Sequence, residues 1–156
     1  MSQNCRILGD TFYSDMLVRF SHCDPAGIVY FPHYFEMVYE AIEDWFDSRI
    51  EPNLETRLRQ DGMGFPTVNT QCDFFKPSRV GDVLDLEIAV ARLGRSAVEF
   101  LVAGKVAGEE RLKFRHLIAL VSLERLRAAP IPEALRAKIA PYVAGGSGLG
   151  RLPNPD

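Results

Sequence analysis

The most informative stretch of the sequence is residues 22–47, which read HCDPAGIVYFPHYFEMVYEAIEDWFD. Its first part carries one acid, Asp24, among the turn-forming residues Pro25 and Gly27. Its second part predicts the longest helix of the chain, beginning at Pro32, because the first helical position needs no N–H partner. The stretch therefore puts a carboxylate in a turn shortly before a helix N-terminus, where unpaired N–H donors and a partial positive charge are available.

The predicted helix has two distinct faces. Apolar residues recur at the i, i+4, i+7, i+8 and i+11 spacing of a single helix face: Tyr34, Val38, Ala41, Ile42 and Trp45. Acidic residues form a second stripe: Glu36, Glu40, Glu43 and Asp47. The acidic stripe is either a solvated face or, in the case of Glu40, the source of a base or nucleophile that reaches into an interfacial pocket.

The rest of the pattern predicts an α+β fold. Alternating apolar residues predict strands over 11–20, 65–75, 83–92, 96–105 and 111–123, and shorter helices are expected at 54–60 and 132–143. In the first strand Phe12, Met16, Val18 and Phe20 share a face, and in the last strand Leu117, Ala119, Val121 and Leu123 do. One long helix can cover one face of a five-stranded antiparallel sheet, and the apolar residues on the other face predict a partner subunit.

Length and composition bound the class of protein. The 156 residues suit one domain over 1–143, followed by a Gly/Pro-rich tail, 144–156, which we expect to be mobile. Hydrophobic and charged fractions of 47% and 25% are those of an ordinary soluble protein. No apolar run approaches the roughly 20 residues that a membrane helix needs, and the N-terminus lacks a signal peptide's apolar stretch, so we expect a cytoplasmic location without membrane association. Three widely spaced cysteines, Cys5, Cys23 and Cys72, argue against a disulfide framework or a zinc site.

The net charge of −3 is unevenly distributed. Residues 1–75 carry 5 basic and 12 acidic side chains, residues 76–115 carry 8 and 6, and residues 116–156 carry 5 and 3. This basic excess in the second half is too small to predict a nucleic-acid partner, but it suits a small polyanion.

Asp24 is the first candidate for chemistry. It is either a plain turn residue, as Asp-Pro commonly is, or a catalytic nucleophile or base. Gly27 permits close backbone approach, and the helix that follows aims N–H donors at the same region. Since Pro32 cannot donate, the N–H of Phe31 is the expected donor. A carboxylate beside an oxyanion site is the minimum requirement for acyl transfer.

The histidines are weaker candidates. His22 and Cys23 directly precede Asp24, but neighbours in an extended segment point to opposite sides, so a Cys/His/Asp triad is not expected. His33, in the first turn of the helix, either contacts a substrate or is simply packed or solvated, and His116 is expected to be structural. Three scattered histidines have no metal-ligand spacing, which predicts no metal site, and no cofactor is expected.

Two further groups suggest a substrate. Tyr30, Phe31, Tyr34 and Phe35 either line an acyl pocket or belong to the core. Four cations lie near predicted strand ends and turns: Lys76, Arg79, Arg92 and Arg95. They either contribute to solubility or, if they cluster in space, bind phosphates, with the Ser96 hydroxyl as a further donor. The chain contains no G-x-x-x-x-G-K-[ST], G-x-G-x-x-G or G-x-S-x-G motif.

At residues 24–34, DPAGIVYFPHY, the sequence resembles the 4-hydroxybenzoyl-CoA thioesterase family of acyl-CoA thioesterases. The preceding RFSHCD and the following EMVYEAIEDWF fit the same pattern, and FKPSRVGD and LGRS match more loosely. The likeness covers about residues 12–124.

The resemblance implies a hotdog fold, in which a five-stranded antiparallel sheet wraps one long helix, and dimers or tetramers with active sites at subunit interfaces. It implies Asp24 as the catalytic carboxylate and the Phe31 N–H as the group that polarises the thioester carbonyl. Gly27, Tyr30, His33, Arg95 and Ser96 are the expected substrate-binding residues.

The implied function is hydrolysis of an acyl-CoA to a carboxylic acid and free CoA, with an aromatic acyl-CoA such as 4-hydroxybenzoyl-CoA among the candidate substrates. The alternative is a hotdog protein that binds acyl-CoA or acyl-carrier protein without turnover. A hotdog dehydratase would need a histidine base, for which His22 and His33 are poorly suited.

Overall fold

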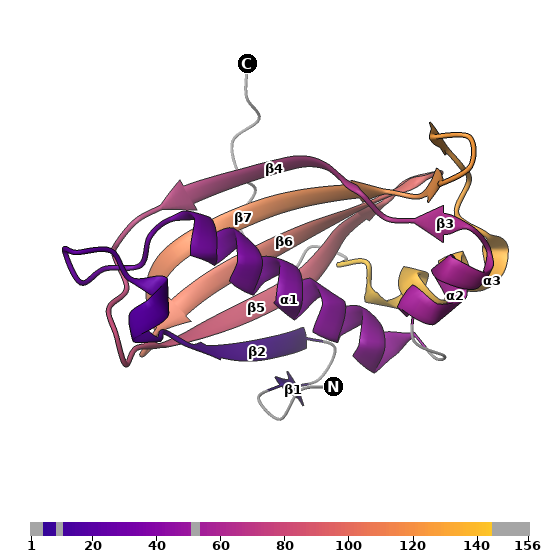
Figure 1. Cartoon of the computed structure of the whole chain (residues 1–156). Coiled ribbons are helices and arrows are strands. Elements are labelled where there is room, and N and C mark those ends of the chain that lie inside the picture. Colours follow the sequence, from indigo (N-terminus) through magenta and orange to yellow (C-terminus); the bar gives the residue numbers. More distant parts are fainter. Residues whose placement is uncertain (1–4, 9–10, 51–53, 145–156) are drawn as a thin grey trace, which may run out of the picture.

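The computed structural model describes residues 5–8, 11–50 and 54–144, and at its centre one long helix lies along one face of an antiparallel sheet (Figure 1). The helix is α1 (Pro32–Arg49). The sheet has six strands in the order β1 (Cys5–Leu8), β2 (Thr11–Leu17), β5 (Val83–Leu93), β6 (Ala97–Val106), β7 (Glu109–Ala119) and β4 (Thr67–Phe74). The predicted α+β architecture is confirmed, whereas the predicted number of five strands is wrong.

The additional strand is β1, which extends the sheet beyond β2. Its four residues show no alternation between buried and exposed positions, so the sequence carries no strand signal there. Its pairing with β2 is accompanied by ion pairs from the Arg6 guanidinium to Asp15 on β2 and Asp85 on β5. These contacts join residues far apart in the sequence, which explains why the strand was missed.

Helix α1 begins at Pro32, as predicted, with the proline in its first turn. The predicted apolar face is confirmed, because Tyr34, Val38, Ala41, Ile42 and Trp45 are all buried. Met37 and Phe46 are buried as well and widen that face, while the acidic residues Glu36, Glu40, Glu43 and Asp47 are exposed. The buried face packs onto the inner side of the sheet and forms the core with it.

The strands alternate in burial, and the alternation decides which face meets α1. On β5 the buried residues are Leu84, Leu86, Ile88 and Val90, as the pattern predicted. On β7 the buried residues are Leu112, Phe114, His116 and Ile118. The four residues predicted to share one face of this strand do not do so, because β7 ends at Ala119: Leu117 and Ala119 point outward, and Val121 and Leu123 lie beyond its end. A polar residue, His116, within the inward set made the other register look more apolar.

The outer face of the sheet is largely charged. Lys105 pairs with Glu87 between β6 and β5, and Arg115 pairs with Glu99 between β7 and β6. Apolar residues also lie on this face, among them Val83 on β5 and Leu117 on β7, although the larger apolar sets of both strands are buried beneath α1. The partner subunit stays a prediction. Further exposed apolar side chains occur at the β4 edge and near the start of α1: Val68, Phe74, Phe75 and Phe31.

Short elements complete the chain. They are η1 (Phe20–His22), α2 (Leu54–Gln60), β3 (Met63–Gly64), β8 (Val121–Ser122), β9 (Arg127–Ala128), α3 (Glu133–Ile139) and η2 (Ala140–Tyr142), with β3, β8 and β9 forming a small second sheet. The predicted helix at 54–60 is confirmed, and the one at 132–143 is α3 followed by η2. The first strand ends at Leu17, and Phe20 is exposed in η1, so its predicted place on one strand face with Phe12 is wrong.

None of the described helices is long and apolar enough to cross a membrane. The single domain over 1–143 stays a prediction. The predicted tail, 144–156, lies outside the described residues except for Ala144.

Candidate active site

The loop before α1 is a tight turn closed by Asp24. One carboxylate oxygen of Asp24 accepts a hydrogen bond from the Ala26 N–H at 2.8 Å. The Gly27 N–H donates to the Asp24 carbonyl at 2.9 Å, and the Asp24 N–H donates to the carbonyl of Ile28 at 2.9 Å. Gly27 has φ +75°, which glycine adopts without strain. Asp24 thus has the geometry of a turn residue, and its second carboxylate oxygen makes no hydrogen bond with any described residue.

Contacts with the connection between β4 and β5 hold this loop in place. Ile28 forms an isolated bridge with Arg79, and the Val29 N–H donates to the Ser78 carbonyl at 3.0 Å. The Ser78 N–H donates in turn to the Tyr34 hydroxyl on α1 at 3.1 Å. Because Val29, Ser78 and Tyr34 are all buried, the loop and the first turn of α1 are fixed relative to each other.

The start of α1 has one free backbone donor. The N–H groups of Tyr30, His33 and Tyr34 are taken up by the carbonyls of His22, Tyr30 and Phe31 at 2.9, 3.0 and 3.1 Å. Pro32 has no N–H. The Phe31 N–H makes no hydrogen bond with any residue that the structure describes. An unpaired donor at a helix N-terminus is suited to an anion or a developing oxyanion.

The aromatic residues predicted to line a pocket divide into two groups. Tyr30 and Phe31 are about half exposed, at 52% and 54%, whereas Tyr34 is buried and supports the loop. Phe31 lies edge-on to Phe35 and to Phe74 of β4, with ring centroids 6.3 and 6.5 Å apart. The aromatic surface beside the free N–H therefore continues from α1 onto the β4 edge.

His22 and His33 face a polar cavity of about 310 Å³ on the other side of α1, toward β2. Their ring centroids are 5.5 Å apart, and His33 Nδ1 lies 2.7 Å from the Glu36 carboxylate. The cavity is also lined by Asp15, Arg19 and Glu40. No hydrogen bond joins His22 or Cys23 to the Asp24 carboxylate within the described residues, so no Cys/His/Asp triad forms there. The described residues also contain no group of three or more His, Cys, Asp or Glu side chains placed to hold a metal ion.

The predicted phosphate-binding residues lie at the opposite end of the sheet. The Asp24 loop is attached near the start of β5, since Val18 donates to the Asp82 carbonyl and Leu17 pairs with Val83. Arg95 and Ser96 follow the end of β5, which as an 11-residue strand spans about 33 Å. Within one chain the structure therefore does not bring Arg95 and Ser96 to the loop.

The other predicted cations are divided between the same two ends. Lys76 and Arg79 lie near the loop, where Lys76 is paired with Glu109. Arg92 lies near the end of β5 and is 3.7 Å from Glu99. The four cations therefore do not cluster in one chain.

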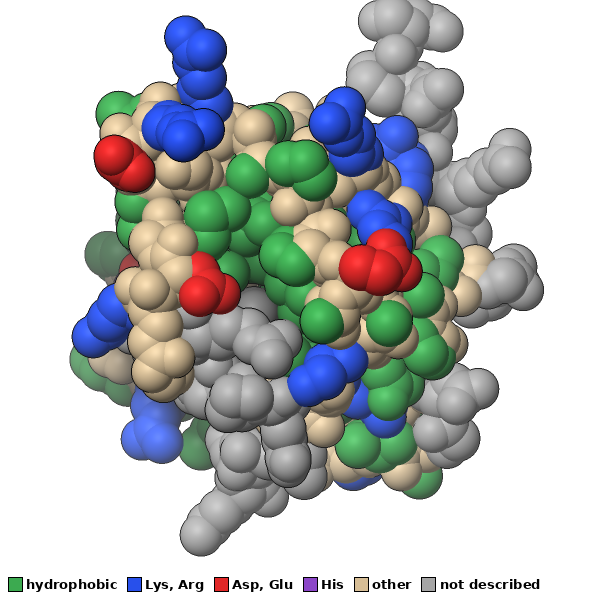
Figure 2. All heavy atoms as spheres, turned by 90° about the vertical axis from the view of Figure 1, so that its right-hand side faces the viewer, with side chains coloured by type: hydrophobic (Ala, Val, Ile, Leu, Met, Phe, Trp, Pro, Cys, Tyr) green, Lys and Arg blue, Asp and Glu red, His purple; other side chains and the backbone are tan. Residues whose placement is uncertain are grey.

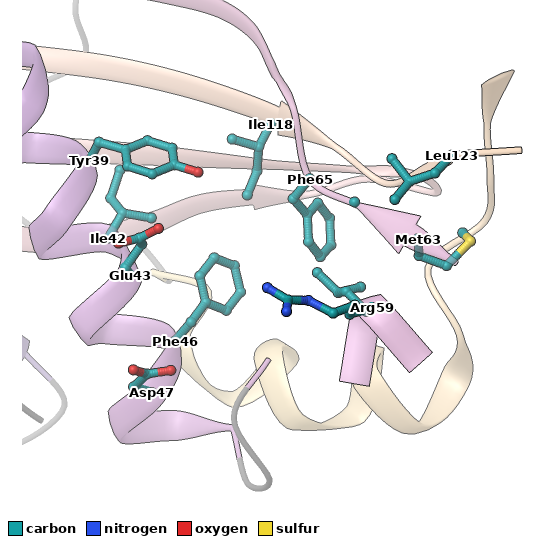
Figure 3. A pocket seen from close by; sticks show the side chains of 12 residues that line it. Tyr39, Ile42, Glu43, Phe46, Asp47, Arg59, Met63, Phe65, Ile118 and Leu123 are labelled. Carbon is teal, nitrogen blue, oxygen red and sulfur yellow. The ribbon is translucent and has the colours of Figure 1, made fainter. Parts of the chain in front are cut away.

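A cavity of about 350 Å³ lies beside the second half of α1, and sequence analysis missed it (Figure 3). Its walls come from α1, α2, β3 and β7, and the residues are Tyr39, Ile42, Glu43, Phe46, Asp47, Leu58, Arg59, Met63, Gly64, Phe65, Ile118 and Leu123. The rings of Phe46 and Phe65 are stacked, with centroids 5.9 Å apart and planes at 22°. The sequence signal was Phe46 at the apolar edge of α1, but the opposite wall comes from residues 58–65, whose position against α1 no local pattern predicts.

This cavity belongs to the end of the molecule that carries α2 and β3, away from the Asp24 loop (Figure 1). Hydrophobic side chains gather in the middle of that end of the surface, with charged side chains around them (Figure 2). Tyr39 lies 8 residues beyond Phe31, which is about 12 Å along the helix axis. In one chain, the cavity and the free N–H are therefore separated along α1.

Comparison with known proteins agrees with this geometry. A sequence model of the thioesterase-like superfamily matches residues 18–139. The 1,4-dihydroxy-2-naphthoyl-CoA hydrolase of Thermosynechococcus vestitus is 30% identical over 132 residues, which cover 81% of this chain and 88% of that protein. The 4-hydroxybenzoyl-CoA thioesterase of a Pseudomonas species is 29% identical over 125 residues, covering 74% and 87%.

Solved structures give the same result. The crystal structure of a thioesterase superfamily protein from Jannaschia sp. CCS1 has a TM-score of 0.80 at 25% identity and covers 93% of this chain and 100% of that one. The superfamily match includes the Asp24 loop, α1 and all the strands of the main sheet after β2, so the helix-on-sheet architecture is the hotdog fold. The family resemblance expected from residues 24–34 is confirmed, and this chain belongs to the thioesterase-like superfamily.

Proposed function

We propose that this protein hydrolyses acyl-CoA thioesters, with Asp24 and the Phe31 N–H as its catalytic groups. The observation that carries the proposal is the unpaired Phe31 N–H at the start of α1, held in one buried framework with the Asp24 loop. As a member of a superfamily whose relatives are named CoA hydrolases and thioesterases, the chain is an acyl-CoA thioesterase.

The chemistry follows from the two groups. The thioester carbonyl oxygen accepts a hydrogen bond from the Phe31 N–H, and the positive end of the α1 dipole stabilises the negative charge that develops on it. Asp24 takes a proton from the attacking water, a tetrahedral intermediate forms, and its collapse breaks the C–S bond. The CoA thiolate leaves and is then protonated, and the acid is released. One well-placed oxyanion donor is worth roughly 3–4 kcal/mol.

Direct attack by Asp24 on the carbonyl is the other route. It expels the thiolate first and leaves a mixed anhydride that water then hydrolyses. A single turnover in H₂¹⁸O tests this route, because hydrolysis of the anhydride at the Asp24 carbonyl puts the label into the enzyme carboxylate and leaves the product acid unlabelled, whereas general-base catalysis labels only the product acid.

We also propose that the complete site needs a second copy of the chain. Strand β4 is an edge of the sheet, and its surroundings expose Val68, Phe74 and Phe75. Antiparallel pairing of β4 with the β4 of another copy would place the Asp24 end of one chain beside the Arg95 end of the other, because a two-fold axis reverses the strand direction. A homodimer, or a tetramer built from two of them, would then unite the groups that one chain separates.

The same pairing supports an aromatic acyl group as the substrate. It would bring the free N–H of one chain toward the second half of the partner's α1, where the cavity with the stacked Phe46 and Phe65 lies. That cavity is apolar, with a few polar groups at Tyr39, Glu43 and Arg59, and suits a ring that bears hydroxyl groups. Two relatives named after hydroxylated aromatic acyl-CoA substrates point to the same class.

The test is release of free thiol from a panel of aromatic and aliphatic acyl-CoAs, with Asp24→Asn as the control. Asparagine keeps the size and the turn chemistry, so the fold should survive while kcat falls on the order of 10²-fold or more. A variant that keeps over half of the wild-type kcat would exclude Asp24 as the catalytic group. Tight acyl-CoA binding by the wild type without thiol release would favour the non-catalytic alternative. A cytoplasmic location remains a prediction that cell fractionation would test.

A further inference from the structure

His22 lies at the junction of the two backbone segments that carry the proposed catalytic groups. Its imidazole Nδ1 accepts a hydrogen bond from the backbone N–H of Arg19 at 3.0 Å, and the backbone N–H of His22 donates to the Arg19 carbonyl at 3.0 Å. These two bonds close the short turn η1, after which Cys23 and Asp24 follow directly. The His22 ring thus holds the chain immediately before the carboxylate.

The backbone of the same residue holds the other segment. The His22 carbonyl accepts the Tyr30 N–H at 2.9 Å, and Tyr30 directly precedes Phe31. The Phe31 N–H follows this bond directly and makes no hydrogen bond with any described residue, so it can bind an oxyanion. The next residue, Pro32, has no N–H. His22 therefore connects the approach to Asp24 with the approach to Phe31.

We propose that His22 is a positioning residue, whose imidazole closes η1 and so sets the distance between the Asp24 carboxylate and the Phe31 N–H. The inference rests on the proposed function of these two groups. Neither the family match nor the sequence assigns a role to this side chain, which sequence analysis considered only as a triad member or a dehydratase base. A displacement of about 1 Å at a reacting centre can lower a rate by around 10²-fold, so a loose turn is sufficient to impair catalysis.

The role requires a neutral imidazole, because a protonated ring has no lone pair with which to accept the Arg19 N–H. Several charged groups surround the ring: His33, Glu36 and Glu40 on α1, Asp15 on β2, and Arg19 in its own turn. Burial first, and then the charges of His33 and Arg19, lower the pKa of His22, while Glu36 and Glu40 act in the opposite direction. The surroundings therefore favour the acceptor form near neutral pH.

Three substitutions separate this role from a general structural one. His22→Asn offers an amide oxygen near the position of Nδ1 and does not titrate, so it keeps the acceptor. His22→Gln moves the acceptor outward, and His22→Ala removes it. We expect His22→Ala and His22→Gln to lose about 10- to 100-fold in kcat with KM changed less than about threefold, while His22→Asn stays within about threefold of the wild type. The kcat–pH profile of His22→Asn should also lack the fall in kcat at acidic pH that protonation of His22 causes in the wild type.

A readout that does not depend on turnover distinguishes failure of this inference from failure of the proposed function. Hydrogen exchange at the Arg19 and Tyr30 amides should accelerate in His22→Ala and His22→Gln but not in His22→Asn, while exchange along β6 stays unchanged. Equal exchange and equal kcat in His22→Ala and wild type, or a His22→Asn variant as impaired as His22→Ala, would overturn the inference. If the wild type hydrolyses no acyl-CoA, the exchange pattern alone decides whether His22 holds the loop.

Discussion

Mixing two impaired variants should restore thioesterase activity if the active site is shared between chains. The first variant, Asp24→Asn, lacks the proposed base, and the second, Arg95→Ala, lacks the predicted phosphate contact. In one chain these residues lie at opposite ends of β5, about 33 Å apart along the strand, so a substrate would have to lie along the whole sheet to contact both. In a two-fold dimer the same residues of different chains would lie side by side.

The size of the effect follows from counting sites. Removing a positioned base lowers the rate on the order of 10²-fold, and removing an Arg–phosphate contact at an exposed site lowers kcat/KM roughly 10-fold. After random reassociation about half of the dimers are mixed, and each mixed dimer has one site with both native residues and one with neither. Activity per chain should therefore rise from about 5% of wild type before reassociation to about 25–30% afterwards.

The assay is kcat/KM from thiol release at substrate concentrations well below KM, before and after the two variants are unfolded together and refolded. Native mass spectrometry of differently tagged chains confirms that mixed dimers form. A shared site predicts the rise, whereas a site within one chain predicts no change on mixing. Mixed dimers without a rise would refute the shared site, and an Arg95→Ala variant with undiminished kcat/KM would refute the phosphate contact. Equal losses with acyl-CoA and acyl-pantetheine would also show that Arg95 does not recognise the nucleotide.

Three predictions concern the framework. Gly104→Ala should destabilise the fold by about 1–3 kcal/mol in urea unfolding, because the new Cβ would lie 2.7 Å from Cδ1 of Leu112. Since this contact couples the two positions, Leu112→Ala should cost less stability in the Gly104→Ala background than in the wild type. Burial lowers the pKa of His116 below its ordinary 6.5, so on acidification the unfolded chain binds the proton first and the free energy of unfolding should fall between pH 7 and pH 5. His116→Gln should weaken that fall, and a pH dependence identical to that of the wild type would contradict the assignment. Burial, and secondarily Asp73, raise the pKa of Cys72 to about 12, so this thiol should resist alkylation at pH 8 in the native state and react only after unfolding.

The local features of the chain could be predicted from the sequence. Pro32 begins the helix because its missing N–H is not needed there, and the residues spaced at 3.6-residue intervals after it are buried. The turn at 24–27 follows from Asp-Pro and from a glycine with positive φ. The 2-residue alternation of β5 predicted its buried face correctly. Each of these depends on interactions within a few residues, which the order of residue types records.

The remaining features of the fold and of the site depend on contacts between distant segments, so only the tertiary structure decided them. Strand β1 exists through pairing with β2 and the ion pairs of Arg6, and the inner face of β7 includes a histidine that no apolar pattern would choose. The sequence predicted the N–H of Phe31 as the donor, but only the structure shows which neighbouring N–H groups are already hydrogen-bonded, one of them to the carbonyl of His22. The cavity beside Phe46 needed a wall from residues 58–65, and the separation of Asp24 from Arg95 needed the length and direction of β5. A sequence lists the groups that can do chemistry, but the distances between them are set by how the sheet and the helix pack.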